Sequence, residues 1–213
     1  MEAQLPYENA LLPRYDSVVP PFWSEIWIIG SGPSATSFNV EQFAGRHVLA
    51  VNDAIFKFFH CSSSEQSPLR AAVTLFSLDA HWVRRHRDFI GELDCEKYLA
   101  LPLETWPDLA GIPGVRYLQW GAGDGLNENI STVNTGCHSG YGALGLAYHK
   151  RAWNIHLVGY DLDPAYNNQY QFWAKNYDAT RDQLRKRNVA VWNHSPNSFI
   201  GAFPKVGNTG GYL

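Results

Sequence analysis

The strongest constraint on the fold is a polar, glycine-rich loop that leads through a helix of small residues into an apolar strand. The loop starts at Asn134, the helix covers residues 139–152, and the strand ends in the turn Gly159-Tyr160-Asp161. A second loop, Gly30-Ser-Gly-Pro-Ser34, directly follows another apolar segment. A helix that starts in such a loop offers unpaired backbone N–H groups and the positive end of its dipole. The two loops therefore predict a nucleotide site at the carboxyl edge of a sheet.

The rest of the chain alternates strand-like and helix-like segments, a pattern typical of a parallel sheet. We expect strands at residues 25–29, 47–51, 69–77, 97–101, 115–120, 155–159 and 189–192. We expect helices at residues 40–44, 80–90, 139–152 and 179–187, and polar loops at 121–136 and 163–173. The sequence predicts a single Rossmann-like α/β domain over residues 24–213, after an extended arm at residues 1–23. Its sheet is expected to be doubly wound and mostly parallel, with helices on both faces.

Composition excludes several classes of protein. The 213 residues carry a net charge of −3, which argues against broad nucleic-acid binding. No apolar run reaches the length of a membrane span, and the first residues lack the pattern of a signal peptide. Cys61, Cys95 and Cys137 are widely spaced and form no C-x-x-C pair, so neither a zinc site nor a disulfide framework is indicated. We expect a cytoplasmic protein without membrane partners.

The first glycine loop supplies candidate nucleotide-binding residues. Its glycines, Gly30 and Gly32, allow a backbone to approach a ligand closely, and Ser31 and Ser34 can donate hydrogen bonds to phosphate or ribose. Pro33 completes the loop. The spacing fits neither the dinucleotide-binding fingerprint nor a Walker loop. The alternative interpretation is a plain strand-to-helix turn.

Polar residues at other strand ends extend the candidate site. Asn52 and Asp53 follow the second strand, where an amide can read a base edge and a carboxylate can bind a hydroxyl, although an Asx turn is the alternative. The remaining candidates open the small-residue helix or follow the last two strands: Ser139, Gly140, Gly159, Tyr160, Asp161, Pro196, Asn197 and Ser198. We expect these side chains to share one edge of the sheet.

Three histidines are candidates for a general base at this edge. His138 precedes the small-residue helix, His81 follows the third strand, and His194 follows the last strand. An imidazole that accepts a proton from a hydroxyl is the usual base in transfer chemistry. Their order of preference stays open. Each also has a structural alternative as a surface or core histidine.

The motifs together resemble the bacterial sialyltransferases of glycosyltransferase family 42 and the related hydroxymethylpterin pyrophosphokinase-like proteins, many of them from phages. The matching pieces are Ile29-Gly-Ser-Gly-Pro-Ser34, Val51-Asn52, Ser139-Gly140, Val158-Gly-Tyr-Asp161 and Pro196-Asn-Ser198. The resemblance implies a transferase in which these residues surround a nucleotide-sugar donor of the CMP type. A hydroxyl-bearing acceptor is then the second substrate, and no metal or further cofactor is required.

Two departures keep alternatives open. The sialyltransferases carry an arginine before the Ser-Gly pair, where this chain has residues 136–138, and a histidine in the stretch that corresponds to residues 162–193, which contains none here. A pyrophosphokinase-like enzyme using ATP and Mg²⁺ is the first alternative, with Asp53, Asp79, Asp161 and Asp163 as possible ligands. A non-catalytic nucleotide-binding protein is the second.

Overall fold

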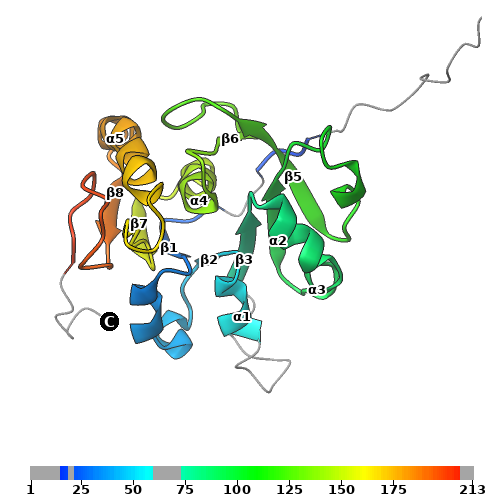
Figure 1. Cartoon of the computed structure of the whole chain (residues 1–213), viewed down its shortest axis with the longest axis horizontal. Helices are drawn as coiled ribbons and strands as arrows, with labels where there is room; N and C mark the ends of the chain where they lie inside the picture. The colour runs from blue at the N-terminus through cyan, green and yellow to red at the C-terminus, as the bar shows by residue number, and fades with distance from the viewer. Residues whose placement is uncertain (1–14, 19–21, 60–72, 207–213) are drawn as a thin grey trace, which may run out of the picture.

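The computed structural model describes residues 15–18, 22–59 and 73–206. Within them, eight strands form one sheet in the order β6-β5-β4-β3-β2-β1-β7-β8, and each neighbouring pair is parallel (Figure 1). The strands are β1 (Glu25–Ile29), β2 (Val48–Val51), β3 (Val73–Ser77), β4 (Glu96–Ala100), β5 (Val115–Gly121), β6 (Thr132–Asn134), β7 (Asn154–Val158) and β8 (Ala190–Asn193).

Helices cover both faces of this sheet. The first face carries η1 (Pro33–Ser37), η2 (Val40–Phe43), α1 (Ala54–Phe59), α2 (Ala80–Arg85), α3 (Arg87–Glu92) and η4 (Pro107–Leu109). The second face carries α4 (Ser139–His149) and α5 (Tyr170–Lys186). Alternate strand residues separate the two cores, because Trp27 packs with the first set of helices and Ile26 with the second. The predicted doubly wound α/β fold is confirmed.

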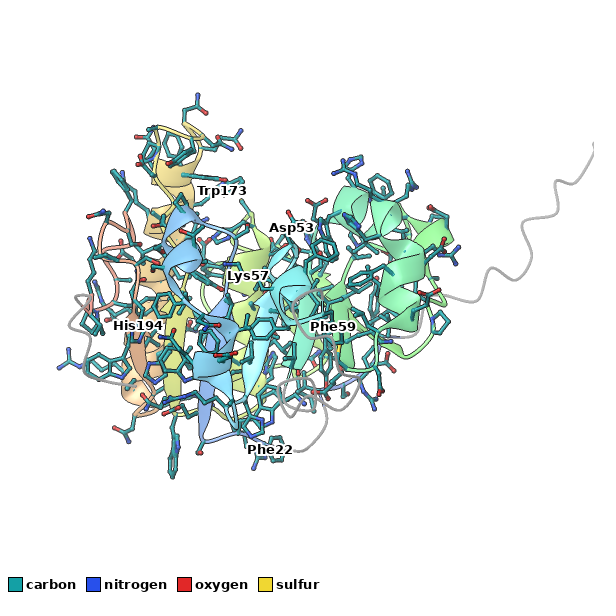
Figure 2. All side chains as sticks on the ribbon, turned by 90° about the horizontal axis from the view of Figure 1, so that it is seen from below. Phe22, Asp53, Lys57, Phe59, Trp173 and His194 are labelled. Atoms are coloured by element: carbon teal, nitrogen blue, oxygen red, sulfur yellow. The ribbon has the colours of Figure 1, made fainter. Side chains whose placement is uncertain are left out.

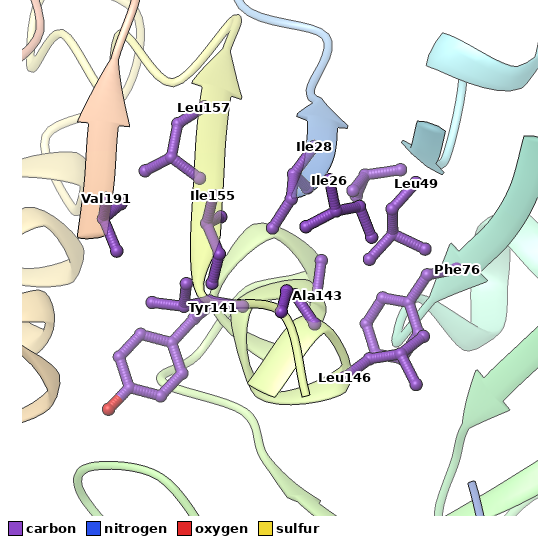
Figure 3. Close-up of a cluster of buried hydrophobic side chains, with 14 of the residues drawn as sticks. Ile26, Ile28, Leu49, Phe76, Tyr141, Ala143, Leu146, Ile155, Leu157 and Val191 are labelled. Atoms are coloured by element: carbon purple, nitrogen blue, oxygen red, sulfur yellow. The ribbon is translucent and has the colours of Figure 1, made fainter. Parts of the chain in front are cut away.

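Helix α4 packs closely against the centre of the sheet. Ten of its residues are buried, and its small side chains leave room for Ile26, Leu49 and Leu157 to reach it (Figure 3). A side chain at Gly142 would meet the ring of Phe76 at 3.0 Å. The composition of the helix thus follows from its position, since larger residues would push it away from the sheet.

The connections create a crevice between β1 and β7. Strand β1 leads to β2 through η1 and η2 on the first face, whereas β7 leads to β8 through α5 on the second face. Adjacent parallel strands whose connections leave on opposite faces separate their loops at the carboxyl edge. Ligands of open α/β sheets bind in such crevices.

Several expected boundaries were wrong. The polar loop at 121–136 contains the short strand β6, and the predicted helix at 80–90 breaks at His86 into α2 and α3. Helix α5 begins nine residues before the expected start, inside the segment expected to be a loop. Residues 69–72 and most of the expected arm lie outside the described residues. Among the described helices, none has both the length and the apolar character needed to span a membrane.

Candidate functional site

A cavity of about 680 Å³ opens at the carboxyl edge of the sheet, at the crevice between β1 and β7. Its volume lies in the range of sites for small molecules. The lining comes from six strand ends and the segments that follow them, including the starts of α4 and α5. It consists of residues 30–33, 51–52, 78–79, Trp120, Thr135, residues 137–140 and 159–163, Tyr166, Tyr170 and Trp173. The structure therefore brings most of the predicted nucleotide-binding residues to one place.

The two glycine turns of the site lie directly against each other. The Gly30 N–H donates to Val158 O at 2.7 Å, and the Gly32 N–H donates to Gly159 O at 3.0 Å. Gly159 has a φ of +73°, and a Cβ there would meet Gly30 O at 2.6 Å. Glycine is needed at these positions because the two backbones touch.

Replacing Gly32 by alanine is expected to destabilise the fold by about 2–3 kcal/mol, because overpacking forces backbone shifts. The new Cβ would collide with Asp161 Oδ2 and lie 2.5 Å from Gly159 O. Gly201→Ala is the matched control, since a Cβ at Gly201 meets nothing within 4 Å. Urea denaturation of both variants measures the effect. Equal midpoints for the two variants would contradict the close approach of the turns.

A serine–aspartate network holds the same turns together. Asp161 Oδ2 accepts hydrogen bonds from Ser34 N at 3.1 Å and from Ser34 Oγ at 2.9 Å. Ser195 Oγ lies 2.7 Å from Ser34 Oγ and accepts from the Tyr160 N–H at 2.9 Å. With Ser34 donating to the carboxylate, Ser195 completes the chain by donating to Ser34. Ser34 thus fixes the position of the Asp161 carboxylate without lining the cavity itself, while the buried Asp161 lines it.

The other predicted carboxylates already accept hydrogen bonds from neutral donors. Asp79 caps α2 by accepting from Trp82 N at 2.9 Å, and Asp53 accepts from Trp82 Nε1 at 2.6 Å. Asp163 accepts from the Ala165 N–H at 2.9 Å. Asp53 does not line the cavity, whereas Asp79 and Asp163 do. Among the described residues, no three His, Cys, Asp or Glu side chains are placed to share a metal ion.

The N-terminus of α4 faces the cavity without a side-chain cap. His138 is the N-cap residue, and its side chain makes no capping hydrogen bond. Ser139 and Gly140, the first two helical residues, both line the cavity. The Ser139 hydroxyl accepts from the Leu78 N–H at 3.1 Å, which fixes the helix start above β3. The N–H groups of this first turn are suited to an anionic group.

His138 is the one predicted base that lines the cavity. Burial lowers the pKa of its imidazole to about 3, so the ring is neutral at physiological pH. The ring stacks on Trp173, with centroids 5.4 Å apart, and its Nε2 atom is shielded from solvent without a hydrogen-bond partner. A base with so low a pKa drives proton transfer weakly. The environment favours a neutral hydrogen-bonding group.

The other two candidate histidines do not line the cavity. His81 is exposed and packs against Trp106 on the first face. His194 hydrogen-bonds to His156 at 2.9 Å and lies away from Trp173 (Figure 2). The segment Pro196–Ser198 also misses the cavity lining, although Ser198 Oγ donates to Tyr160 O and supports the turn after β7. A position directly after a strand is therefore not enough to place a residue in the cavity, because the loop after β8 packs against the turn after β7 instead.

Sequence reasoning missed the aromatic part of the lining. Trp120 at the end of β5 and Tyr166, Tyr170 and Trp173 after β7 all border the cavity. Cys137, exposed and with a φ of +71°, lies beside them at the start of α4. The density of aromatic and amide residues after Asp161 was the available signal. It led us to expect a loop at residues 163–173 that closes over a bound nucleotide, but no single aromatic residue was named as a binding residue.

Comparison with known proteins corrects the family expected from the sequence. No protein-family model and no solved structure matches the chain. A curated thymidylate synthase of Rhizobium rhizogenes is 31% identical over 101 residues, which are 46% of this chain and 32% of that protein. The chain thus matches about a third of the length of this relative. The expected resemblance to sialyltransferases and pyrophosphokinase-like proteins was therefore wrong, since the similar protein that was found is a thymidylate synthase.

Proposed function

We propose that this chain binds a nucleotide in the cavity at the crevice between β1 and β7. The observation that carries the proposal is the uncapped N-terminus of α4, which faces a cavity of about 680 Å³ beside the glycine loop 30–33. The first-turn N–H groups and the Ser31 hydroxyl are suited to a phosphate. The aromatic residues Tyr170 and Trp173 are suited to a base or a ribose.

A pyrimidine nucleotide is the first ligand to test. The matched relative is a thymidylate synthase, and thymidylate is a pyrimidine nucleotide. A transfer reaction with a hydroxyl-bearing acceptor has weaker support in the geometry, because His81 and His194 do not line the cavity and His138 is a weak base. Binding is therefore the proposed function.

Isothermal titration calorimetry with a nucleotide panel tests the proposal. The panel contains TMP, CMP, AMP and ATP, each in EDTA and then in Mg²⁺, together with the matching nucleosides and phosphate methyl esters. We expect saturable one-to-one binding of at least one pyrimidine ligand. No binding by any member of the panel would overturn the proposal, and binding of ATP with Mg²⁺ alone would favour a kinase-like site.

A pair of charge variants locates the phosphate. In Ser31→Asp, a new carboxylate enters the loop that borders the cavity, so affinity is expected to fall about tenfold or more through charge repulsion. Thr36→Asp adds the same charge to exposed residue 36 of η1, outside the cavity lining, and is expected to leave affinity within about twofold. Equal losses in both variants would place the phosphate elsewhere.

A further inference from the structure

The charge of the cavity limits the phosphate that it can hold. Its lining contains Asp79, Asp161 and Asp163, and none of the described residues that line it is lysine or arginine. The hydrogen-bond donors found for these carboxylates are backbone N–H groups and the Ser34 hydroxyl, which carry no full charge. The helix N-terminus contributes roughly half a positive charge. A phosphate with two or more negative charges is therefore poorly compensated.

Aromatic side chains stand at opposite sides of the cavity. Trp120 comes from β5 and Tyr166 from the segment after β7, and four strands lie between β5 and β7 in the sheet. Figure 1 shows α4 between β5 and α5. Trp120 is 43% exposed and Tyr166 is 70% exposed, so both rings have free surface. Exposed rings at the mouth of a cavity are suited to stacking on a planar group.

Two unpartnered polar atoms also require a ligand group. Asn52 Oδ1 and His138 Nε2 are shielded from solvent without a hydrogen-bond partner, and both residues line the cavity. A buried polar atom without a partner lowers stability, and a ligand group that bonds to it removes that cost. Both groups are uncharged, since the His138 ring stays neutral. They are suited to hydrogen-bonding groups of a nucleoside.

From the cavity's charge, its two aromatic sides and its unpartnered atoms, we infer that the site takes a phosphodiester with a ring on each side of a single phosphate. One ring is the nucleoside of the proposed function, on which this inference rests. The phosphate lies at the start of α4, and the second ring stacks on Trp120. A diester carries one negative charge, whereas a terminal phosphate carries close to two at neutral pH. The ligand class is thus a nucleoside linked through one phosphate to a second ring.

Calorimetry in EDTA at pH 7.5 tests the charge part of this inference. The probes are TMP, its methyl ester and the dinucleoside monophosphate thymidylyl-thymidine, together with the same series built on adenosine. In the series that binds, the methyl ester is expected to bind about tenfold more tightly than the monophosphate, and the second nucleoside to add about another tenfold. A monophosphate that binds as tightly as its ester would overturn the inference while leaving nucleotide binding intact.

Two tryptophan variants test the second ring. Trp120→Ala is expected to abolish the gain from the second nucleoside and to leave the affinity for the methyl ester within about twofold. Trp153→Ala is the matched control, because Trp153 is 65% exposed and precedes β7 at the opposite edge of the sheet. The inference fails if Trp120→Ala weakens both ligands equally, or if it weakens neither. Failure of both series and of the whole nucleotide panel to bind would instead reject the proposed function.

Discussion

Lowering the pH from 7 to 5 is expected to reduce the free energy of unfolding by about 3 kcal/mol, through histidines that the fold keeps neutral. Burial lowers the pKa of His138 to about 3, and burial together with His156 lowers that of His194 to about 4. In the unfolded chain both titrate near pH 6.5. Below that pH the unfolded chain binds more protons than the folded protein, so stability falls as pH falls towards about 4.

Each of these two rings changes the free energy of unfolding by about 1.4 kcal/mol per pH unit below the unfolded pKa. The contribution of His194 is smaller, because solvent reaches part of its ring. Urea denaturation of the wild type and of the double variant His138→Asn/His194→Asn between pH 5 and 7 measures the effect. The double variant is expected to lose a large part of the pH dependence, and the rest stays because burial also lowers the pKa of His47, His149 and His156. His81→Asn, at an exposed position, is the control and should keep it. An unchanged slope in the double variant would refute the assignment.

Glu96→Ala is expected to destabilise the protein by about 3–4 kcal/mol, because it leaves a buried ammonium group without its counter-ion. Lys150 Nζ lies 2.8 Å from both carboxylate oxygens of Glu96, and its side chain is fully buried between Trp23 and Tyr98. The Tyr98 hydroxyl donates to the same carboxylate at 2.9 Å. Chemical denaturation measures the loss.

A second ion pair of equal length provides the contrast. Arg84 and Asp108 also meet at 2.8 Å, but both side chains are about half exposed. Asp108→Ala is therefore expected to leave the denaturation midpoint almost unchanged. The replacement Lys150→Met removes the buried charge together with its need for a partner, so adding Glu96→Ala to it should cost much less than Glu96→Ala in the wild type. Additive losses in the double variant would contradict a direct pair.

The fold was largely predictable because its strands are buried and apolar. Strands β1, β2 and β7 were predicted within one residue, since each is a short apolar run that ends at glycine or asparagine. Strand β6 was missed because three residues are too few to show a period, and its parallel pairing with β5 comes from tertiary structure. The start of α5 was missed because residues 170–173 are aromatic and polar, without a typical capping residue.

The candidate site was predictable only where it follows from strand order. The loops after β1 and β7 meet because those strands are neighbours in the sheet. The glycine motifs at residues 30–34 and 159–161 identified both of these loops in the sequence. Trp120 comes from β5, five positions away from β7 in the sheet, so nothing local in the sequence links it to Asp161. The burial that sets the pKa of His138 likewise arises from rings contributed by α5.

Because the two glycine turns touch, the cavity can form only at a late stage of folding. Gly30 and Gly159 lie 129 positions apart in the chain, yet their backbones touch. The loop they close spans most of the protein, so the cavity forms only after the central strands have paired. Amide exchange in β1 and β7 should therefore require global unfolding. A ligand bound in the cavity is expected to slow this exchange by the same factor by which it lowers the equilibrium constant of global unfolding.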